Sequence, residues 1–235
     1  MVVRIAAPDL SVIIPVFNEE DSVQEIHDGL ASTLGRLNLR WEMLFVDDGS
    51  TDQTASMLVA LRMRDRRVQV SSCAVHQGLS HVLSRGFQHS RGRILVSIDG
   101  DLQYDPEEIP LLLRALDGTD VVCGWRRQRK DSWDRVALSR IAFTVRRLAL
   151  GDRIHDAGCT FRAYRRSCVA RLVLQRGEHR FLPYILSRRG CTLREIPVTH
   201  RPRGYGKSKF GFSRLSSGLM VLARLWFRSG KSWQR

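Results

Sequence analysis

The chain has 235 residues, of which 43 % are hydrophobic and 26 % charged, and its formal net charge is +14. The apolar content excludes an intrinsically disordered chain, and 18 glycines with 7 prolines exclude a collagen-like or low-complexity one. The five cysteines are odd in number and lack CxxC spacing, so we expect neither a disulfide framework nor a cysteine zinc site.

The charge is divided unevenly along the chain. Residues 1–120 hold 11 Lys and Arg against 18 Asp and Glu, whereas residues 121–235 hold 27 against 6. Such asymmetry indicates an acidic half and a half that meets polyanions, which can be substrate phosphates, anionic lipid headgroups or nucleic acid. The plain alternative is a basic protein with many arginines on solvated faces.

Neither a signal peptide nor a membrane span is visible in the sequence. Residues 1–10 include Arg4, Pro8 and Asp9 and lack the apolar core of about 7–15 residues that a signal peptide needs. No stretch supplies the roughly 20 apolar residues of a transmembrane helix. We therefore expect a cytoplasmic chain.

Short apolar runs and helical periodicity alternate through the first 120 residues. In chain order the pattern predicts a strand over 10–16, a helix over 19–37, a strand over 41–46, a helix over 51–61, a strand over 68–73, a helix over 79–89, a strand over 94–98, a helix over 107–116 and a strand over 121–123. Strands that alternate with helices of this length indicate βαβ units and an α/β fold with a mostly parallel sheet.

The alternation becomes irregular after Gly124. The pattern predicts a helix over 134–150, a strand over 159–164, helices over 169–174 and 181–189, a strand over 193–199, a loop over 201–206 and a final helix over 210–227. Because no repeat or linker interrupts the chain, we predict one domain over 1–235. Its parts are a nucleotide- and metal-binding half (1–124), an acceptor-binding half (125–209) and a basic, amphipathic C-terminal helix (210–235).

Acidic residues follow two of the predicted strands directly. Asp47 and Asp48 follow WEMLFV, and Asp99 and Asp101 follow ILVSI. In an open parallel sheet the ligand lies beyond the carboxyl ends of the strands, so these two loops can meet at one site. Two carboxylates around one glycine suit a divalent cation held by diphosphate oxygens, although turns and helix caps use the same residues. Gln103 adds a neutral oxygen.

The loop after the second strand also has a structural interpretation. In Asp47-Asp48-Gly49-Ser50-Thr51, Ser50 or Thr51 could cap the following helix. Two common phosphate motifs are absent: Gly206-Lys207-Ser208 lacks the P-loop glycine five positions earlier, and no GxGxxG follows a predicted strand. A nucleotide would therefore be held through carboxylates and a metal.

Three segments in this order, SVIIPVFNEE, FVDDGSTD and SIDGDLQYDPEE, resemble family 2 glycosyltransferases with the GT-A fold. Three basic segments, GWRRQRKDSWDRVALSR, DAGCTFRAYRR and RPRGYGKSK, resemble the polyprenyl-phosphate glycosyltransferases within that family. This group includes dolichyl-phosphate mannose synthases and the bacterial enzymes that load undecaprenyl phosphate with a sugar. The resemblance extends from about Leu10 to Leu225. One departure is His76-Gln77-Gly78, where the family often has Asn.

The resemblance implies a role for each matching position. Pro15, Phe17, Glu19, Asp47 and Asp99 would bind the nucleotide, and Asp99, Asp101 and Gln103 would hold Mg²⁺ or Mn²⁺. Arg126, Arg135, Arg203 and Lys209 would surround the sugar diphosphate and the acceptor phosphate. The expected catalytic set is Asp101, Arg126, Arg203 and Lys209.

A phosphate acceptor fits the uneven charge of the chain. A phosphomonoester has a second pKa of about 6, so it is a nucleophile at neutral pH without a general base. Arginine and lysine would hold this phosphate, and the metal would neutralise the leaving diphosphate. If the acceptor were instead a saccharide or protein hydroxyl, Asp105 or Asp156 would be the candidate base. A UDP-sugar or a GDP-sugar could serve as donor.

The final helix predicts attachment to the inner face of the membrane. Leu215, Leu219, Leu222 and Trp226 share one side, and neighbouring arginines can reach anionic headgroups. The alternatives are a helix packed on the sheet and docking to a separate integral membrane protein. A nucleic-acid-binding protein is a distant alternative, since no aromatic stacking stripe accompanies the basic runs, and we expect no nucleic-acid partner. An inactive member that only scaffolds a partner also stays open.

Overall fold

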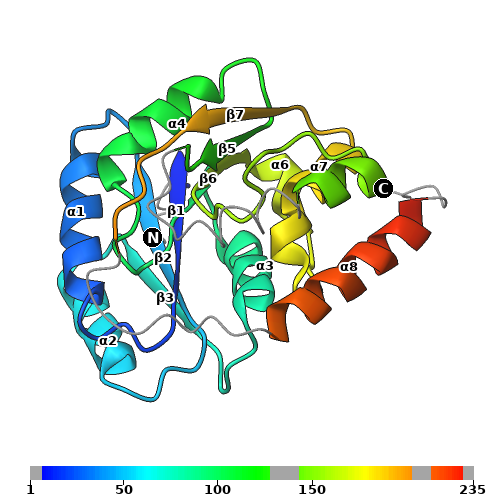
Figure 1. The fold of residues 1–235 in the computed structure, drawn as a ribbon. Helices are drawn as coiled ribbons and strands as arrows, with labels where there is room; N and C mark the ends of the chain where they lie inside the picture. Colours follow the sequence, from blue (N-terminus) through cyan, green and yellow to red (C-terminus); the bar gives the residue numbers. More distant parts are fainter. Residues whose placement is uncertain (1–6, 128–142, 203–212, 230–235) are drawn as a thin grey trace.

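A seven-stranded sheet forms the centre of the molecule in the computed structural model, which describes residues 7–127, 143–202 and 213–229 (Figure 1). The strand order is β3-β2-β1-β4-β6-β5-β7. The strands are β1 (Leu10–Val16), β2 (Trp41–Asp47), β3 (Val68–Ser72), β4 (Ile94–Ser97), β5 (Val121–Trp125), β6 (Arg162–Arg165) and β7 (Leu193–Pro197).

Helices cover both faces of this sheet. The labelled helices are α1 (Val23–Gly35), α2 (Thr54–Arg64), α3 (Leu79–His89), η1 (Pro106–Glu108), α4 (Ile109–Ala115), α6 (Arg166–Val169), η2 (Glu178–Phe181), α7 (Leu182–Arg188) and α8 (Ser213–Ser229), and residues 143–150 are also helical. Figure 1 shows α1, α2 and α4 on one side of the sheet and α3, α6, α7 and α8 on the other. The predicted α/β fold with a mostly parallel sheet is confirmed.

The strand directions bring most strand ends to one edge. β1, β2, β3 and β4 are parallel, β6 runs antiparallel between β4 and β5, and β7 is parallel to β5. All strands except β6 therefore end at the same edge, called here the carboxyl edge, and β6 begins there. Loops far apart in sequence meet at this edge, as the pattern of acidic residues predicted.

Successive side chains of the central strands pack alternately into two hydrophobic cores, one on each face of the sheet. In β1, Val12 and Ile14 point to the core under α1 and α4, whereas Ile13 points to the core under α3 and α7. Every residue of β2 is buried. Burial on both faces explains why these strands read as continuous apolar runs and why the sheet provides a rigid base for its edge loops.

Most elements differ from their predicted bounds by a few residues, for example α2, which covers 54–64 and not 51–61, and the following differences are the most informative. α1 begins at Val23 and not at residue 19, because the backbone N–H of Glu19 donates to Thr54 Oγ1 at the start of α2. The expected strand over 159–164 starts only at Arg162. The expected helix over 169–174 is wrong: α6 ends at Val169, and the N–H of Leu174 donates to Ser84 Oγ on α3. A 3₁₀ turn precedes α4.

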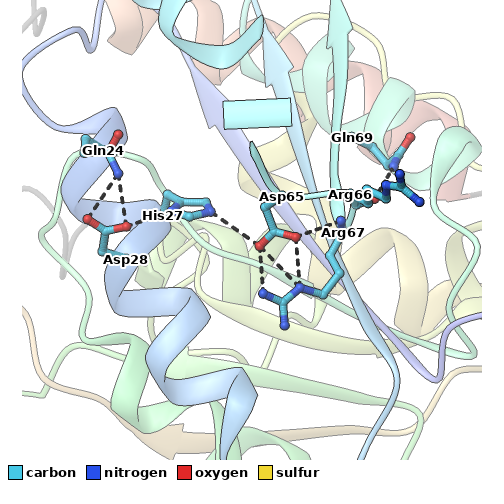
Figure 2. A network of polar contacts seen from close by, with 7 residues as sticks. All are labelled: Gln24, His27, Asp28, Asp65, Arg66, Arg67 and Gln69. Atoms are coloured by element: carbon cyan, nitrogen blue, oxygen red, sulfur yellow. Dashed lines mark hydrogen bonds and ion pairs between the residues drawn. The ribbon is translucent and has the colours of Figure 1, made fainter. Parts of the chain in front are cut away.

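A polar network ties α1 to the start of β3 (Figure 2). His27 of α1 contacts Asp28 (Nδ1–Oδ1 2.8 Å) and lies 3.7 Å from Asp65 (Nε2–Oδ2). The Arg67 guanidinium donates to Asp65 and lowers the pKa of that carboxyl, and its Cζ also lies over the Trp41 ring, 3.9 Å from the ring centroid. The network therefore fastens two helices to the amino end of β3.

The helix α8 packs on the second core through Val221 and Leu225, which are buried. Met220, Trp226 and Phe227 are exposed on its outer side. Leu222 and Trp226, which the sequence predicted on one apolar side, therefore have different surroundings. Leu222 is half-buried against the core, whereas Trp226 is exposed. The side chains of Leu215 and Leu219 lie outside the described residues.

Candidate active site

The two acidic loops both lie against the end of β1. Asp47 ends β2 directly opposite Val16 in the sheet register. A Cβ on Gly100 would lie 2.9 Å from Val16 Cγ1, so the Asp99-Gly100-Asp101 loop rests on the same strand end. Ser22, just before α1, secures this loop by donating from its hydroxyl to the Gly100 carbonyl at 2.8 Å. Both acidic loops therefore lie at the carboxyl edge, beside the end of β1.

Asp99 and Asp101 form a pair of close negative charges. Burial of the Asp99 carboxyl and the charge of Asp101 raise the pKa of Asp99 to about 6, although a hydrogen bond from Thr160 Oγ1 (2.5 Å) opposes this shift. Asp101 is 8 % exposed and accepts a hydrogen bond from the Gln103 N–H. Leu102 between them has a φ of 62°, an uncommon backbone conformation for leucine.

This pair fits a divalent cation. Two largely buried carboxylates that repel one another, with an amide side chain two residues on, supply the hard oxygens that Mg²⁺ or Mn²⁺ prefers. Within the described ranges, no cluster of three or more His, Cys, Asp or Glu is placed to hold a metal. A small number of protein ligands is what Mg²⁺ uses when phosphate oxygens complete its coordination shell.

Gln103 connects this loop to a second segment. Its Nε2 donates to the Arg201 carbonyl at 3.2 Å, and the Arg201 N–H donates to the Gln103 carbonyl at 2.8 Å. The Arg201 guanidinium pairs with Asp105, which also caps η1. Asp105, one of the two candidate bases for a hydroxyl acceptor, is thus engaged in an ion pair.

The turn after β2 is stabilised by hydrogen bonds within the turn and by hydrogen bonds to the residues that follow β1. Asp47 accepts hydrogen bonds from the Ser50 N–H (3.0 Å) and hydroxyl (2.6 Å). Asn18 Oδ1 accepts from the Thr51 N–H at 2.8 Å. The expected capping of the next helix by Ser50 or Thr51 is wrong, because α2 begins after Gln53 and these hydroxyls contact Asp47 and Asn18.

Asp48 organises the loop after β3, which the sequence did not indicate. Its almost fully buried carboxylate accepts hydrogen bonds from the N–H groups of Gln77 and Gly78, both at 2.8 Å, and contacts His76 Nδ1 at 2.9 Å. Phe17 follows β1 and places its ring 4.2 Å from that of His76. These contacts of Asp48 with residues 76–78 are called here the Asp48 clamp. They join residues about 30 positions apart in the sequence, so only the three-dimensional structure reveals them.

Gly49 is required where this clamp closes. Its φ is +76°, and an added Cβ would lie 2.8 Å from the Val75 carbonyl carbon, which is backbone and cannot yield easily. We expect Gly49→Ala to lower the free energy of unfolding by several kcal/mol and to weaken nucleotide binding. Thermal melts and calorimetric titration measure both effects.

Gly118→Ala is the matched control. Gly118 has nearly the same φ, +71°, but nothing lies within 4 Å of its added Cβ. Gly118→Ala should therefore lower the free energy of unfolding only by the cost of a left-handed backbone conformation for alanine, about 1 kcal/mol. Equal losses in the two variants would contradict the role of close contact at Gly49.

On the other side of the edge, Arg126 and Asp156 form a buried ion pair. Arg126 Nε and Nη2 donate to the two carboxylate oxygens at 2.7 and 2.9 Å. Burial alone would lower the pKa of Arg126, but Asp156 outweighs it and raises this pKa. The positive charge of Arg126 also acts on Asp99, so the structure brings this predicted phosphate-binding residue to the acidic pair. Asp156, the other candidate base, is held in the pair.

The remaining predicted site residues divide into two groups. Pro15, Phe17 and Glu19 lie at the end of β1 and just beyond it, at the carboxyl edge. Arg135, Arg203 and Lys209 lie outside the described residues. The structure therefore assembles the predicted nucleotide and metal residues together with Arg126.

Similar proteins were found at the levels of sequence and fold. The chain is 35 % identical over 208 residues to the undecaprenyl-phosphate 4-deoxy-4-formamido-L-arabinose transferase of Edwardsiella ictaluri (strain 93-146). That match covers 88 % of this chain but only 64 % of the length of the relative.

Solved structures of glucosyl-3-phosphoglycerate synthase from Mycobacterium tuberculosis have the same fold. The complex with Mn²⁺, UDP and glucosyl-3-phosphoglycerate gives a TM-score of 0.68 at 22 % identity, covering 95 % of this chain and 80 % of that one. The complex with Mg²⁺ and UDP gives 0.66 at 21 % identity, with coverage of 95 % and 80 %. The sheet and its helices thus form a GT-A fold.

The family model for glycosyl transferase family 2 matches residues 11–173. This range contains β1 through α6 and with them both acidic loops, the Asp48 clamp and the Arg126–Asp156 pair. The chain belongs to glycosyl transferase family 2.

Proposed function

We propose that this chain is a metal-dependent inverting glycosyltransferase that moves a sugar from a nucleotide diphosphate donor to a polyprenyl phosphate. The observation that carries the proposal is the Asp99–Asp101 pair at the end of β4, set beside the ends of β1 and β2. The relative named for undecaprenyl phosphate supports the acceptor, and the UDP-bound structures of the same fold support the donor class.

Each side of the carboxyl edge has its own task. Asp99, Asp101 and Gln103 would hold Mg²⁺ or Mn²⁺, which when bound supplies positive charge for the leaving diphosphate. Pro15, Phe17, Glu19 and Asp47 would hold the nucleotide. Glu19 and Asp47 are kept in place by contacts with Ser22 and Ser50, so the nucleotide meets a preformed surface.

The acceptor phosphate would be held by Arg126, Arg135, Arg203 and Lys209. The Arg126–Asp156 pair uses Nε and Nη2, so Nη1 is the guanidinium nitrogen outside it. A phosphate dianion needs no carboxylate to remove a proton, which agrees with the engagement of Asp105 and Asp156 in ion pairs.

A donor screen tests this function. The purified chain is incubated with undecaprenyl phosphate, Mg²⁺ or Mn²⁺, and a panel of UDP- and GDP-sugars, and glycolipid is detected by mass spectrometry. We expect a metal-dependent product with one donor. A donor that is consumed only with a saccharide or protein acceptor would overturn the polyprenyl assignment and favour a hydroxyl-directed glycosyltransferase.

The proposal places the chain at the inner membrane face as a peripheral protein. Among the described residues no helix has both the length and the apolar character needed to cross a bilayer. Instead α8 exposes Met220, Trp226 and Phe227 beside the cationic Arg224, which suits an interface of acyl chains and anionic headgroups.

Exposed aromatic residues of α8 should therefore contribute to lipid binding. We expect the double change Trp226→Ser and Phe227→Ser to reduce binding to vesicles containing anionic lipid by roughly 10-fold or more, because two large apolar side chains are removed from the interface. Vesicle co-sedimentation measures the change. Met63→Ser is the matched control, since Met63 is also exposed and belongs to α2, which lies on the other side of the sheet from α8 (Figure 1). Equal losses in both variants would contradict the assignment.

A further inference from the structure

The loop between β3 and α3 carries an aromatic side chain to the carboxyl edge. His76 contacts Asp48 after β2 and Phe17 after β1, so one ring touches two neighbouring strand ends. The Phe17 and His76 rings are tilted by 34° with centroids 4.2 Å apart. Asp47, the adjacent predicted nucleotide ligand, is the last residue of β2.

This ring is held firmly. Asp48 binds Nδ1 of the ring and the N–H groups of the two residues that follow it, so one buried carboxylate fixes both the side chain and its loop. Gly49 brings the loop backbone into contact with the turn that bears Asp48. A ring anchored before binding loses little conformational entropy when a ligand arrives.

The same ring is nevertheless open to solvent. The His76 side chain is 55 % exposed, whereas its partner Asp48 is 5 % exposed. A histidine that served only to neutralise a buried carboxylate would gain from being covered. An anchored and exposed ring beside a second aromatic residue is instead a surface on which a planar ligand can stack.

We propose that His76 is a nucleotide-binding residue, whose ring packs against that of Phe17 and offers its outer face as a platform for the nucleobase of the donor. This inference rests on the proposed function, which supplies the nucleotide. Asp48 acts as the positioning residue, because it holds the ring at the carboxyl edge. Stacking recognises the flat face of any base, so the platform contributes affinity, and the choice among bases falls to polar groups at their edges.

Nucleotide binding to the full chain tests the platform without any acceptor. Titration calorimetry with UDP, GDP and ADP in the presence of Mg²⁺ compares the wild type with His76→Ala and His76→Phe. We expect His76→Ala to weaken every detectable interaction by roughly 10- to 100-fold, which is the usual effect of removing one stacked ring. His76→Phe, which keeps the ring and loses its nitrogens, should remain within about threefold of the wild type.

The control is His89→Ala, which removes an exposed histidine at the far end of α3 and should leave affinity unchanged. Unchanged affinity in His76→Ala would overturn the role of His76 and leave the proposed function intact. Equal losses in His76→Phe and His76→Ala would overturn stacking. Absence of binding by the wild type to any of these nucleotides would overturn the proposed function together with this inference.

Discussion

Asp101→Asn will lower the rate of sugar transfer by about 100-fold or more while leaving the fold at least as stable as the wild type. The loss follows because the amide no longer supplies a negative oxygen for the cation that balances the leaving diphosphate. Transfer of radiolabelled sugar to lipid, measured over a range of Mg²⁺ concentrations, gives the size of the effect.

The stability part of this expectation has a definite sign. The pKa of Asp99 is raised to about 6, partly by the charge of Asp101. An acid whose pKa rises on folding makes the protein less stable as pH increases from its unfolded pKa, about 4, to its folded pKa. Removing the Asp101 charge reduces this penalty, so thermal melts at pH 7 with a chelator should show an equal or higher melting temperature.

Asp117→Asn is the matched control, because Asp117 is exposed and lies in the turn after α4. It should change neither transfer nor stability. Full activity of Asp101→Asn at all metal concentrations would contradict the placement of the cation at this loop.

The second large effect is on stability. Asp156→Ala leaves the buried Arg126 guanidinium without its carboxylate, and breaking a buried ion pair from one side costs about 3–5 kcal/mol. For a chain of this size the melting temperature should fall by roughly 10 °C. Calorimetry of Arg126→Met, Asp156→Leu and the double variant completes a double-mutant cycle, and the double variant should recover much of the stability lost in the single ones.

An exposed ion pair provides the comparison. Arg36 and Glu107 are each more than half exposed, so solvent screens the pair and Glu107→Ala should hardly change the melting temperature. Asp156→Ala should in addition abolish most transfer, because Arg126 loses the orientation that brings its charge to Asp99. A small loss of stability in Asp156→Ala, similar to that of Glu107→Ala, would contradict this account.

The succession of strands and helices in the first half of the chain and the acidic edge could be predicted because both follow from local patterns. Runs such as LSVIIPV are buried on both faces, and this burial is visible as an unbroken apolar stretch. The parallel arrangement then places every residue that directly follows such a run at the same edge. Asp47 and Asp99 needed no further information to be brought together.

What the sequence concealed was the use of polar side chains over long separations. Asn18 and Glu19 fit the start of a helix by composition, but in the structure they bind the turn after β2, and α1 begins four residues later than predicted. Asp48 reads as one half of an acidic pair, yet its hydrogen bonds go to residues 76–78. Such contacts depend on which loops become neighbours in the fold, and the periodicity of apolar residues carries no information about these neighbours.

The antiparallel strand β6 has a consequence for how such a protein can diversify. β5 ends at the carboxyl edge and β6 begins at that same edge in the adjacent position, so the two points between which the β5–β6 connection is closed lie side by side. Closing a longer excursion between two fixed, adjacent points costs little more than closing a shorter one. The connection can therefore vary in length without moving the strands, as long as the residues at its two ends, Arg126, Asp156 and Thr160, keep their contacts with one another and with Asp99.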